Sequence, residues 1–320
     1  MGDGPTILIT GAAGNLGSLL ARHLFAAGRS LRLMFHKRPL AEDLRSAPGV
    51  TPVQADLARP ETLPPAVRGV DVAVHFAGVL FAPRPERFLP ETNTAWFRNL
   101  LEAALDAGVR RVVLISFPHV EGPTTPDRPA TGRLDGAAVS VHARTRLEEE
   151  KLLFERTRGT ETTPISLRLG MVYGCGILMV EAARWLARKR LLAVWKDPTW
   201  IHLVSTEDYL RATEAAALKE GVEGIYHVGD EKPTTLQHFL DEACCVWGYP
   251  RPHRLPVRLI RAAAALCELY AFVFRTRSPL TRDFITIGRV PYCGETDRFR
   301  EELLPTLTYP TLEAGRHTLR

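Results

Sequence analysis

The sequence predicts an α/β fold in which a parallel sheet is covered by helices on both faces. Through the first half of the chain, short apolar runs alternate with segments of helical periodicity, which is typical of doubly wound parallel sheets. The first run, residues 6–10, leads directly into a glycine-rich turn and then into a helix. Together these observations predict a Rossmann-type core that binds a nucleotide.

The individual elements follow from local patterns. Residues 6–10, T-I-L-I-T, form an unbroken apolar and β-branched run, as in a buried parallel strand. Leucines at helical spacing follow until Gly28, which favours the end of a helix. Further strands are predicted at residues 31–35, 50–55, 70–76, 111–116 and 165–169, and further helices at residues 94–107 and 140–156.

The alternation weakens beyond Gly170. We expect the Rossmann core in residues 1–174, with residues 201–230 returning to it, and a smaller substrate-binding lobe in residues 175–200 and 231–320. The later elements are predicted to be helices at 178–188, 236–247 and 259–274 and one more sheet strand at 224–229.

Composition excludes several classes of protein. The net charge of +5 comes from scattered basic residues, so a solvated surface is favoured over a nucleic-acid site. The five cysteines show no metal-ligand spacing, so we expect no metal and a reduced, cytoplasmic location. Residues 262–274 are too short to cross a bilayer, which needs roughly 20 residues. A homodimer is left open.

The turn T-G-A-A-G-N-L-G, residues 10–17, is the strongest functional signal. Gly11 permits a tight turn, Gly14 lets the backbone approach a pyrophosphate, and Gly17 allows close contact between helix and strand. Free N–H groups at the start of the helix would then bind phosphate. The expected cofactor contacts of this loop are Thr10, Gly11, Ala13, Gly14, Asn15, Leu16 and Gly17.

The spacing of this loop, with several later motifs, resembles the extended short-chain dehydrogenases/reductases. The matching segments are Asp56-Leu57, V-H-F-A-G at 74–78, the helix at 93–104, S-F-P-H-V-E-G-P at 116–123 and R-L-G-M-V-Y-G at 168–174. Residues 282–288 and 303–315 are similar to the branch that contains 3β-hydroxysteroid dehydrogenases. The resemblance implies that the cofactor contacts Asp56, Leu57, Phe76, Ala77, Gly78 and Asn93.

The residues at the end of the second strand favour NADP(H) over NAD(H). NAD-binding proteins place an acidic residue there, which binds the ribose 2′-hydroxyl. This chain instead has His36, Lys37 and Arg38, whose basic side chains could bind a 2′-phosphate.

The catalytic positions depart from the family pattern. The resemblance implies a Ser, a Tyr and a Lys, with the Tyr acting as acid or base. No tyrosine in the chain is followed four residues later by lysine. His142 stands at the tyrosine position, Arg146 at the lysine position and Ser116 at the first serine of the motif, with Phe117 after it.

Three interpretations of these positions stay open. In the first, His142 is the acid/base of an oxidoreductase, because an imidazole has a pKa near 6.5, and Arg146 favours its neutral form. In the second, the scaffold catalyses a non-redox reaction, such as an isomerisation, cyclisation or elimination, with His119 as a partner. In the third, the protein binds a dinucleotide without turnover.

The substrate side is predicted from apolar residues near the later strands. Phe117, Met171, Val172 and Tyr173 are the candidate substrate contacts, and they favour a partly hydrophobic small molecule. Core packing would explain the same residues. Residues 259–274 favour packing or a substrate wall over contact with a membrane surface. Residues 148–150, E-E-E, are expected to form a solvated helix face.

Overall fold

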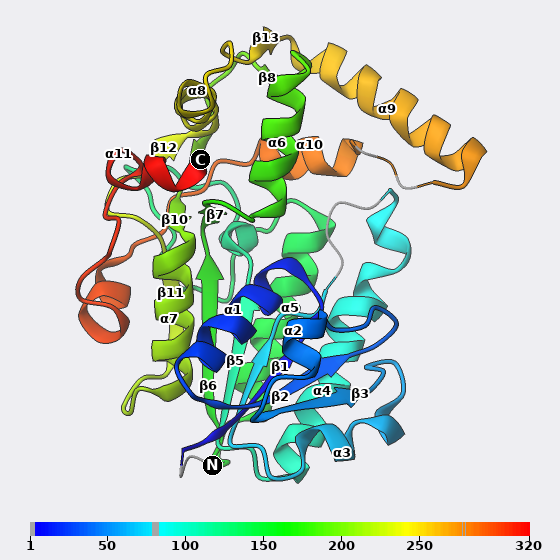
Figure 1. Ribbon diagram of the computed structural model, residues 1–320, viewed down its shortest axis with the longest axis vertical. Helices are drawn as coiled ribbons and strands as arrows, with labels where there is room; N and C mark the ends of the chain where they lie inside the picture. Colours follow the sequence, from blue (N-terminus) through cyan, green and yellow to red (C-terminus); the bar gives the residue numbers. More distant parts are fainter. Residues whose placement is uncertain (1–3, 79–82, 277, 279) are drawn as a thin grey trace.

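The computed structural model describes residues 4–78, 83–276, 278 and 280–320. Its central sheet has seven parallel strands in the order β11-β6-β5-β4-β1-β2-β3, which confirms the predicted α/β fold (Figure 1). The strands are β1 (Thr6–Thr10), β2 (Ser30–Phe35), β3 (Val50–Gln54), β4 (Val72–His75), β5 (Arg111–Ser116), β6 (Thr163–Leu169) and β11 (Gly224–Val228).

The strand order reverses between β1 and β4, which makes this pair the topological switch point of the sheet. From β1 the chain builds outward through β2 to β3, and it then crosses to the other side of β1 to form β4. The loops after β1 and β4 therefore leave the sheet in opposite directions. Ligands of doubly wound sheets bind at the carboxyl ends of the strands at such a switch point.

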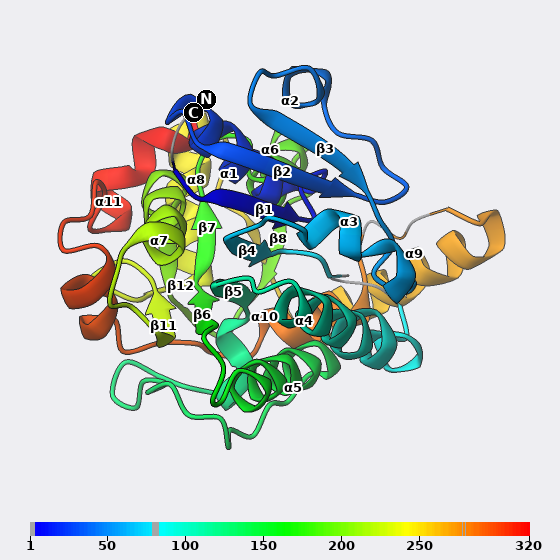
Figure 2. The same ribbon diagram turned by 90° about the horizontal axis from the view of Figure 1, so that it is seen from below.

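Helices cover both faces of the sheet (Figure 2). One face carries α1 (Asn15–Ala26) and α7 (Thr206–Leu218), which contact each other. The other face carries α3 (Pro64–Val67), α4 (Trp96–Asp106) and α5 (Val141–Arg156). The short α2 (Glu42–Arg45) lies before β3 at the sheet edge, and single turns form η1 (Pro60–Thr62), η2 (Pro85–Arg87), η3 (Pro90–Ala95) and η4 (Pro118–Glu121).

The later part of the chain sits over the carboxyl ends of the strands (Figure 1). Its helices are α6 (Leu178–Arg188), α8 (Leu236–Trp247), α9 (Val257–Phe274), α10 (Arg282–Gly288), α11 (Leu312–Gly315) and η6 (Arg316–Leu319), whereas η5 (Phe299–Leu303) packs beside β11 and α7 at the edge of the sheet. Its strands pair as β7 (Met171–Tyr173) with β10 (Leu203–Ser205), β9 (Trp200–Ile201) with β12 (Thr234–Thr235), and β8 (Ala193–Trp195) with β13 (His253–Leu255).

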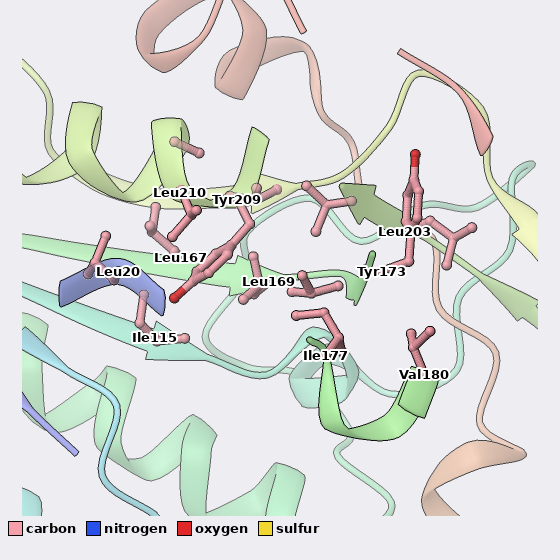
Figure 3. Close-up of a cluster of buried hydrophobic side chains, with 14 of the residues drawn as sticks. Leu20, Ile115, Leu167, Leu169, Tyr173, Ile177, Val180, Leu203, Tyr209 and Leu210 are labelled. Carbon is pink, nitrogen blue, oxygen red and sulfur yellow. The ribbon is translucent and has the colours of Figure 1, made fainter. Parts of the chain in front are cut away.

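One hydrophobic cluster joins this upper part to the sheet (Figure 3). Leu167 on β6 and Tyr209 on α7 are buried at one end of it, and Ile177 and Val180, at the start of α6, are buried at the other end. The hydroxyl of Tyr209 also donates a hydrogen bond to the carbonyl of Leu16, 2.9 Å away. The phosphate-loop helix and the upper elements are therefore built on one continuous core.

Most predicted elements are confirmed, including helices 178–188 and 236–247 and the sheet strand β11. The predicted helix at 94–107 differs at its start, because the chain enters it through the π-helical turn η3. The division into core and lobe at residue 174 stays a prediction. Among the described residues, no helix combines the length and apolar character needed to cross a membrane.

The expectation of a solvated face at residues 148–150 is wrong for two of the three glutamates. Glu148 is exposed and pairs with Lys151, but Glu149 and Glu150 are fully buried. These two glutamates are buried because their carboxylates bond to arginine side chains. Glu149 bonds Arg146 within α5, and Glu150 bonds Arg168 on β6. Buried carboxylates persist where such partners compensate their desolvation.

Asp230, just beyond β11, is a buried carboxylate without compensation. Its side chain is 1% exposed, and neither oxygen has a hydrogen-bond partner among the described residues. Burial, reinforced by the negative charge of Asp208, raises the pKa of Asp230 to about 8. The folded state therefore holds a proton that the unfolded chain releases near its ordinary pKa of about 3.9.

We expect Asp230→Asn to flatten the pH dependence of stability. Because the folded pKa is raised, stability is fully present below about pH 4 and is lost as pH rises toward 8. At pH 8 the variant should exceed the parent by about 1 kcal/mol or more in free energy of unfolding. Urea titrations from pH 5 to 9 measure this difference.

Asp127→Asn, at an exposed position, is the matched control and should change nothing. A parent whose stability does not fall between pH 5 and 8 relative to Asp230→Asn would contradict a protonated Asp230.

Candidate functional site

The loop after β1 folds tightly against the end of β4. Gly11 has φ +69°, and a Cβ there would lie 3.0 Å from the backbone nitrogen of Ala77. A Cβ at Gly14 would lie 3.0 Å from the carbonyl oxygen of Gly11, and one at Gly17 would lie 2.5 Å from the same oxygen. All three glycines are therefore required by close backbone approaches, at the switch point of the sheet.

The first turn of α1 offers an anion site. Its N-cap, Gly14, makes no side-chain capping bond, and the first turn contains no acidic residue. The free N–H groups at the start of a helix, with the helix dipole, attract phosphate. The glycine cradle and the uncapped helix together fit a dinucleotide pyrophosphate.

Asn15 has a structural role that the sequence did not indicate. Its side-chain amide donates to the carbonyl of Gly176 at 2.8 Å, and its side-chain oxygen accepts from the backbone N–H of Leu178 at 2.9 Å. The expected cofactor contact at Asn15 is therefore restricted to its backbone, because its side chain links the phosphate loop to the start of α6.

Thr10 and His75 form a buried pair between β1 and β4. The Thr10 hydroxyl lies 2.8 Å from Nδ1 of His75, whose ring packs against Phe97. Burial, aided by the charge of Arg146, lowers the pKa of His75 to about 3, so the ring is neutral. We infer that this pair sets the spacing of the two strand ends, since both groups are satisfied by each other.

The far side of the loop carries the residues expected at the adenine ribose. Nε2 of His36 lies 3.3 Å from a carboxylate oxygen of Asp56, which places the ends of β2 and β3 together. Lys37 and Arg38 are exposed, and no hydrogen bond or ion pair engages their side chains within the described part of the chain. Leu57 is buried, and its carbonyl accepts a bond from Asn99.

Helix α5 presents a polar face to the ends of β4 and β5. Ser140 caps the helix by accepting a bond from the N–H of Ala143, 3.1 Å away. Arg146, one turn beyond His142, donates to Glu149 at 2.6 Å and to the carbonyl of Ala77 at 3.3 Å. It also fills the space where a Cβ of residue 78 would lie, so a side chain there would displace the guanidinium.

Asn93 joins the same cluster from η3. Its amide nitrogen donates to the hydroxyl of Thr145 at 3.0 Å, and its buried Oδ1 has no partner in the described structure. Phe76, on the other side of the β4 end, packs edge-to-face against Tyr209. The strand-four motif and Asn93 therefore converge with α5, and the cofactor contacts expected of them stay a prediction.

Three aromatic rings follow one another at the end of β5. The ring of Phe117 lies 4.6 Å, centroid to centroid, from His142 on one side and 4.6 Å from His119 on the other. His119 also bonds the carbonyl of Val290 through Nε2, at 2.9 Å. Buried atoms that lack partners among the described residues include the hydroxyl of Ser116, Nδ1 of His119 and Nδ1 of His142.

Both histidines are held neutral. Burial lowers the pKa of His142 well below 6.5, and the charge of Arg146 acts in the same direction. Burial lowers the pKa of His119 to about 4. A neutral imidazole can accept a proton through its free nitrogen, so this cluster suits a proton-accepting group near neutral pH.

Glu149 is a site residue that sequence reasoning missed. It is fully buried beside Arg146, and burial raises its pKa to about 7 against the opposing effect of the arginine. The spacing of residues 142, 146 and 149 on one helical face could have revealed it. The run of three glutamates hid this signal.

The expected substrate contacts fall into two groups. Phe117 lies inside the histidine cluster. Tyr173 lies outside it: the side chain is fully buried, packs against Phe239, and its hydroxyl lies 3.5 Å from the carbonyl of Thr311. Val172 is buried in the same core, and Met171 is half-buried at its edge.

Two other features lie apart from this cluster. A cavity of about 570 Å³ lies between α3 and α4, and its lining includes Pro64, Arg98 and Glu102 but no residue of the phosphate loop or of α5. Within the described residues, no group of histidine, cysteine and acidic side chains could hold a metal ion.

Comparison with known proteins agrees with this geometry. The family described as NAD(P)H-binding matches residues 11–152, from the phosphate loop into α5. The 2-alkyl-3-oxoalkanoate reductase of Shewanella oneidensis is 24% identical over 87% of this chain and 76% of its own. Sterol demethylase protein B of Methylococcus capsulatus is 27% identical over 95% of this chain and 94% of its own.

A solved structure shows the same fold. The Thermus thermophilus UDP-glucose 4-epimerase, in complex with NAD, superimposes with a TM-score of 0.76 at 20% identity, over 98% of this chain and 97% of its own. Together these similarities support an extended short-chain dehydrogenase/reductase. They also support NAD(P)H binding and an oxidoreductase or epimerase-like activity.

We expect Gly11→Ala to weaken cofactor binding through crowding at the switch point. The added methyl group would press on the backbone of Phe76 and Ala77, at a φ that L-residues rarely adopt. NAD(P)H affinity should fall tenfold or more, measured by cofactor fluorescence.

Gly28→Ala separates strain from crowding. Its φ of +72° imposes similar backbone strain, but nothing lies within 4 Å of the added Cβ. Both variants should lose about 1–2 kcal/mol of stability, and only Gly11→Ala should lose affinity. Equal affinities would show that the close approach is not part of the cofactor site.

Proposed function

We propose that this enzyme is an NADP(H)-preferring oxidoreductase acting at a carbonyl or hydroxyl group, with His142 as its acid/base. One observation carries the proposal. His142 is buried against Phe117 at the end of β5, and its Nδ1 has no partner among the described residues. An unsatisfied buried nitrogen is costly unless a ligand supplies the missing bond.

The proposed chemistry divides hydride and proton. When bound, the nicotinamide accepts the hydride from the substrate carbon or supplies it. His142 handles the proton at the substrate oxygen: neutral imidazole accepts it as a hydroxyl becomes a carbonyl, and returns it in the opposite direction. The lowered pKa of His142 makes the proton-accepting form the resting one.

Arg146 acts as a positioning residue in this proposal. Its guanidinium spans from Glu149 to the carbonyl of Ala77 and thereby fixes α5 against the end of β4. Burial is the main cause of the lowered pKa of His142, four residues earlier, and the charge of Arg146 adds to it. Arginine does not exchange its proton near neutral pH, so it cannot replace His142 as the acid/base.

The preference for NADP(H) rests on charge. Lys37 and Arg38 are exposed at the end of β2, with no ion-pair partners in the described structure, and His36 beside them contacts Asp56. A ribose 2′-phosphate would supply the negatively charged partner that Lys37 and Arg38 lack in the described structure. Asp56 already accepts the N–H of Ala58, which fixes its orientation.

The proposed substrate is a partly apolar small molecule that enters between the sheet and residues 175–200 and 231–320. Phe117 offers an apolar surface between the two histidines. Two relatives carry names that refer to apolar molecules, a 2-alkyl-3-oxoalkanoate and a sterol. These names support the substrate class and no individual compound.

A second candidate is a non-redox reaction on the same scaffold, such as an isomerisation. Two neutral histidines on either side of Phe117 favour it, because His119, whose Nε2 donates to Val290, could remove a proton through its bare Nδ1 while the N–H of His142 returns one. The absorbance of the reduced nicotinamide during turnover separates the candidates: net change supports the oxidoreductase, and product formation without net change supports the isomerase.

We expect His142→Phe to lower turnover by about 10²–10⁴-fold, the usual contribution of a general acid/base. His238→Gln, on the exposed surface of α8, is the control and should retain full activity. Unchanged turnover in His142→Phe would remove His142 from the reaction.

The pH profile gives an independent reading. Because the pKa of His142 is lowered, kcat/KM for oxidation should stay constant as pH falls and should decrease only well below pH 6.5, where the imidazole becomes protonated. The value of kcat/KM for reduction should instead increase as pH falls.

We expect Lys37→Ala combined with Arg38→Ala to lower NADPH affinity about tenfold or more and to leave NADH affinity nearly unchanged. The reason is that only NADPH carries the 2′-phosphate. Lys196→Ala, at an exposed site outside the loop, is the control. Parallel loss of both cofactors would overturn the assignment of these residues to the 2′-phosphate.

A further inference from the structure

Helix α9 extends from the body of the enzyme and has two apolar faces. Both ribbon views show it projecting beyond the neighbouring elements (Figures 1 and 2). Its narrow inner face is buried through Ile260, Ala264 and Ala271. An ordinary surface helix has polar residues on the opposite side, which water solvates.

The outer face of α9 is instead made of large apolar side chains. Each of them is more than half exposed: Leu259, Leu266, Leu269, Tyr270, Phe272, Val273 and Phe274. At 3.6 residues per turn they spread over roughly 200° of the helix circumference. Monomeric proteins rarely expose so continuous an apolar surface without a partner.

The charged side chains of α9 that form no ion pair within the described residues are all positively charged. Arg258, Arg261 and Arg275 are exposed, and none forms an ion pair within the described residues. The one acid of the helix, Glu268, is turned toward α10 and accepts bonds from the backbone and side chain of Arg282, at 2.7 and 2.8 Å. The exposed surface is therefore apolar and cationic.

We propose that α9 is a docking surface for an anionic lipid bilayer, into whose interface the end of the helix inserts. Large apolar residues bordered by arginine are typical of helices that lie in the membrane plane. The width of the apolar arc favours a lipid surface over a second copy of the chain. Acyl chains can surround the end of a projecting helix, whereas the flat face of another protein would cover only one side of it. Paired arginines of two copies would also repel each other.

The surface is distinct from the proposed active site. No residue of the outer face of α9 belongs to the cofactor loop or to the histidine cluster, so lipid binding needs neither cofactor nor substrate. The docking proposal can fail while the proposed reaction stands, and the reverse is also true.

Vesicle flotation with the full chain tests the proposal. Vesicles of equimolar phosphatidylcholine and phosphatidylglycerol should carry the protein upward, and pure phosphatidylcholine vesicles should carry at least tenfold less. Combined Phe272→Ser and Phe274→Ser should lower binding tenfold or more. Leu191→Ser, equally exposed outside α9, is the matched control and should bind as the parent does.

Charge reversal tests whether the arginines of α9 contribute to binding of anionic lipid. Combined Arg258→Glu and Arg261→Glu should lower binding to the anionic vesicles, whereas Arg188→Glu on α6 should have little effect. The proposal is overturned if the parent does not float with anionic vesicles, if it binds both compositions equally, or if Leu191→Ser loses as much binding. A parent dimer that ignores vesicles and dissociates on the double serine change would assign the face to a second copy.

Discussion

A fully buried arginine holds the reaction side of the molecule together. Arg168, on β6, donates to Glu150 of α5 at 2.7 Å and also pairs with Glu121 of η4. Glu121 in turn accepts the backbone N–H groups of residues 131–133. Removing one partner of such a network leaves an uncompensated charge in the interior, which typically costs about 3–5 kcal/mol. The side chain of Arg168 thus fixes β6, α5, η4 and residues 131–133 relative to one another.

This constraint determines the rotation of α5. The inward face of the helix mixes apolar residues such as Leu147 and Leu153 with polar ones, so burial of apolar area alone does not orient it. Its partners orient it instead: Glu150 meets Arg168, and Arg146 reaches the carbonyl of Ala77. With the helix fixed at these two points, the ring of His142 is directed against Phe117. The charged residues farther along α5 therefore determine where His142, at the altered catalytic position, is placed.

Local patterns made the sheet and the phosphate loop predictable, because strand runs, helix periodicity and glycine spacing are properties of neighbouring residues. The cluster at His142 and Arg146 was located by the resemblance of the surrounding motifs. What could not be predicted depends on distant partners. Glu150 meets a side chain 18 positions later, and Asn15 meets a carbonyl 161 positions later. In a single sequence, the three glutamates of α5 look like any solvated helix face, and nothing in the loop shows that the amide of Asn15 is already engaged.

The engagement of Asn15 has a thermodynamic consequence. The residue opens α1, where phosphate would bind, and its amide fixes Gly176 and Leu178 at the entrance to α6. A shift of the helix terminus toward an anion is thereby transmitted to the upper part of the molecule. Coupling between two binding events is reciprocal, so a ligand that tightens one end of this link raises the affinity at the other by the same factor. If these two bonds persist when ligands bind, cofactor and substrate occupancy would be linked equilibria rather than independent ones.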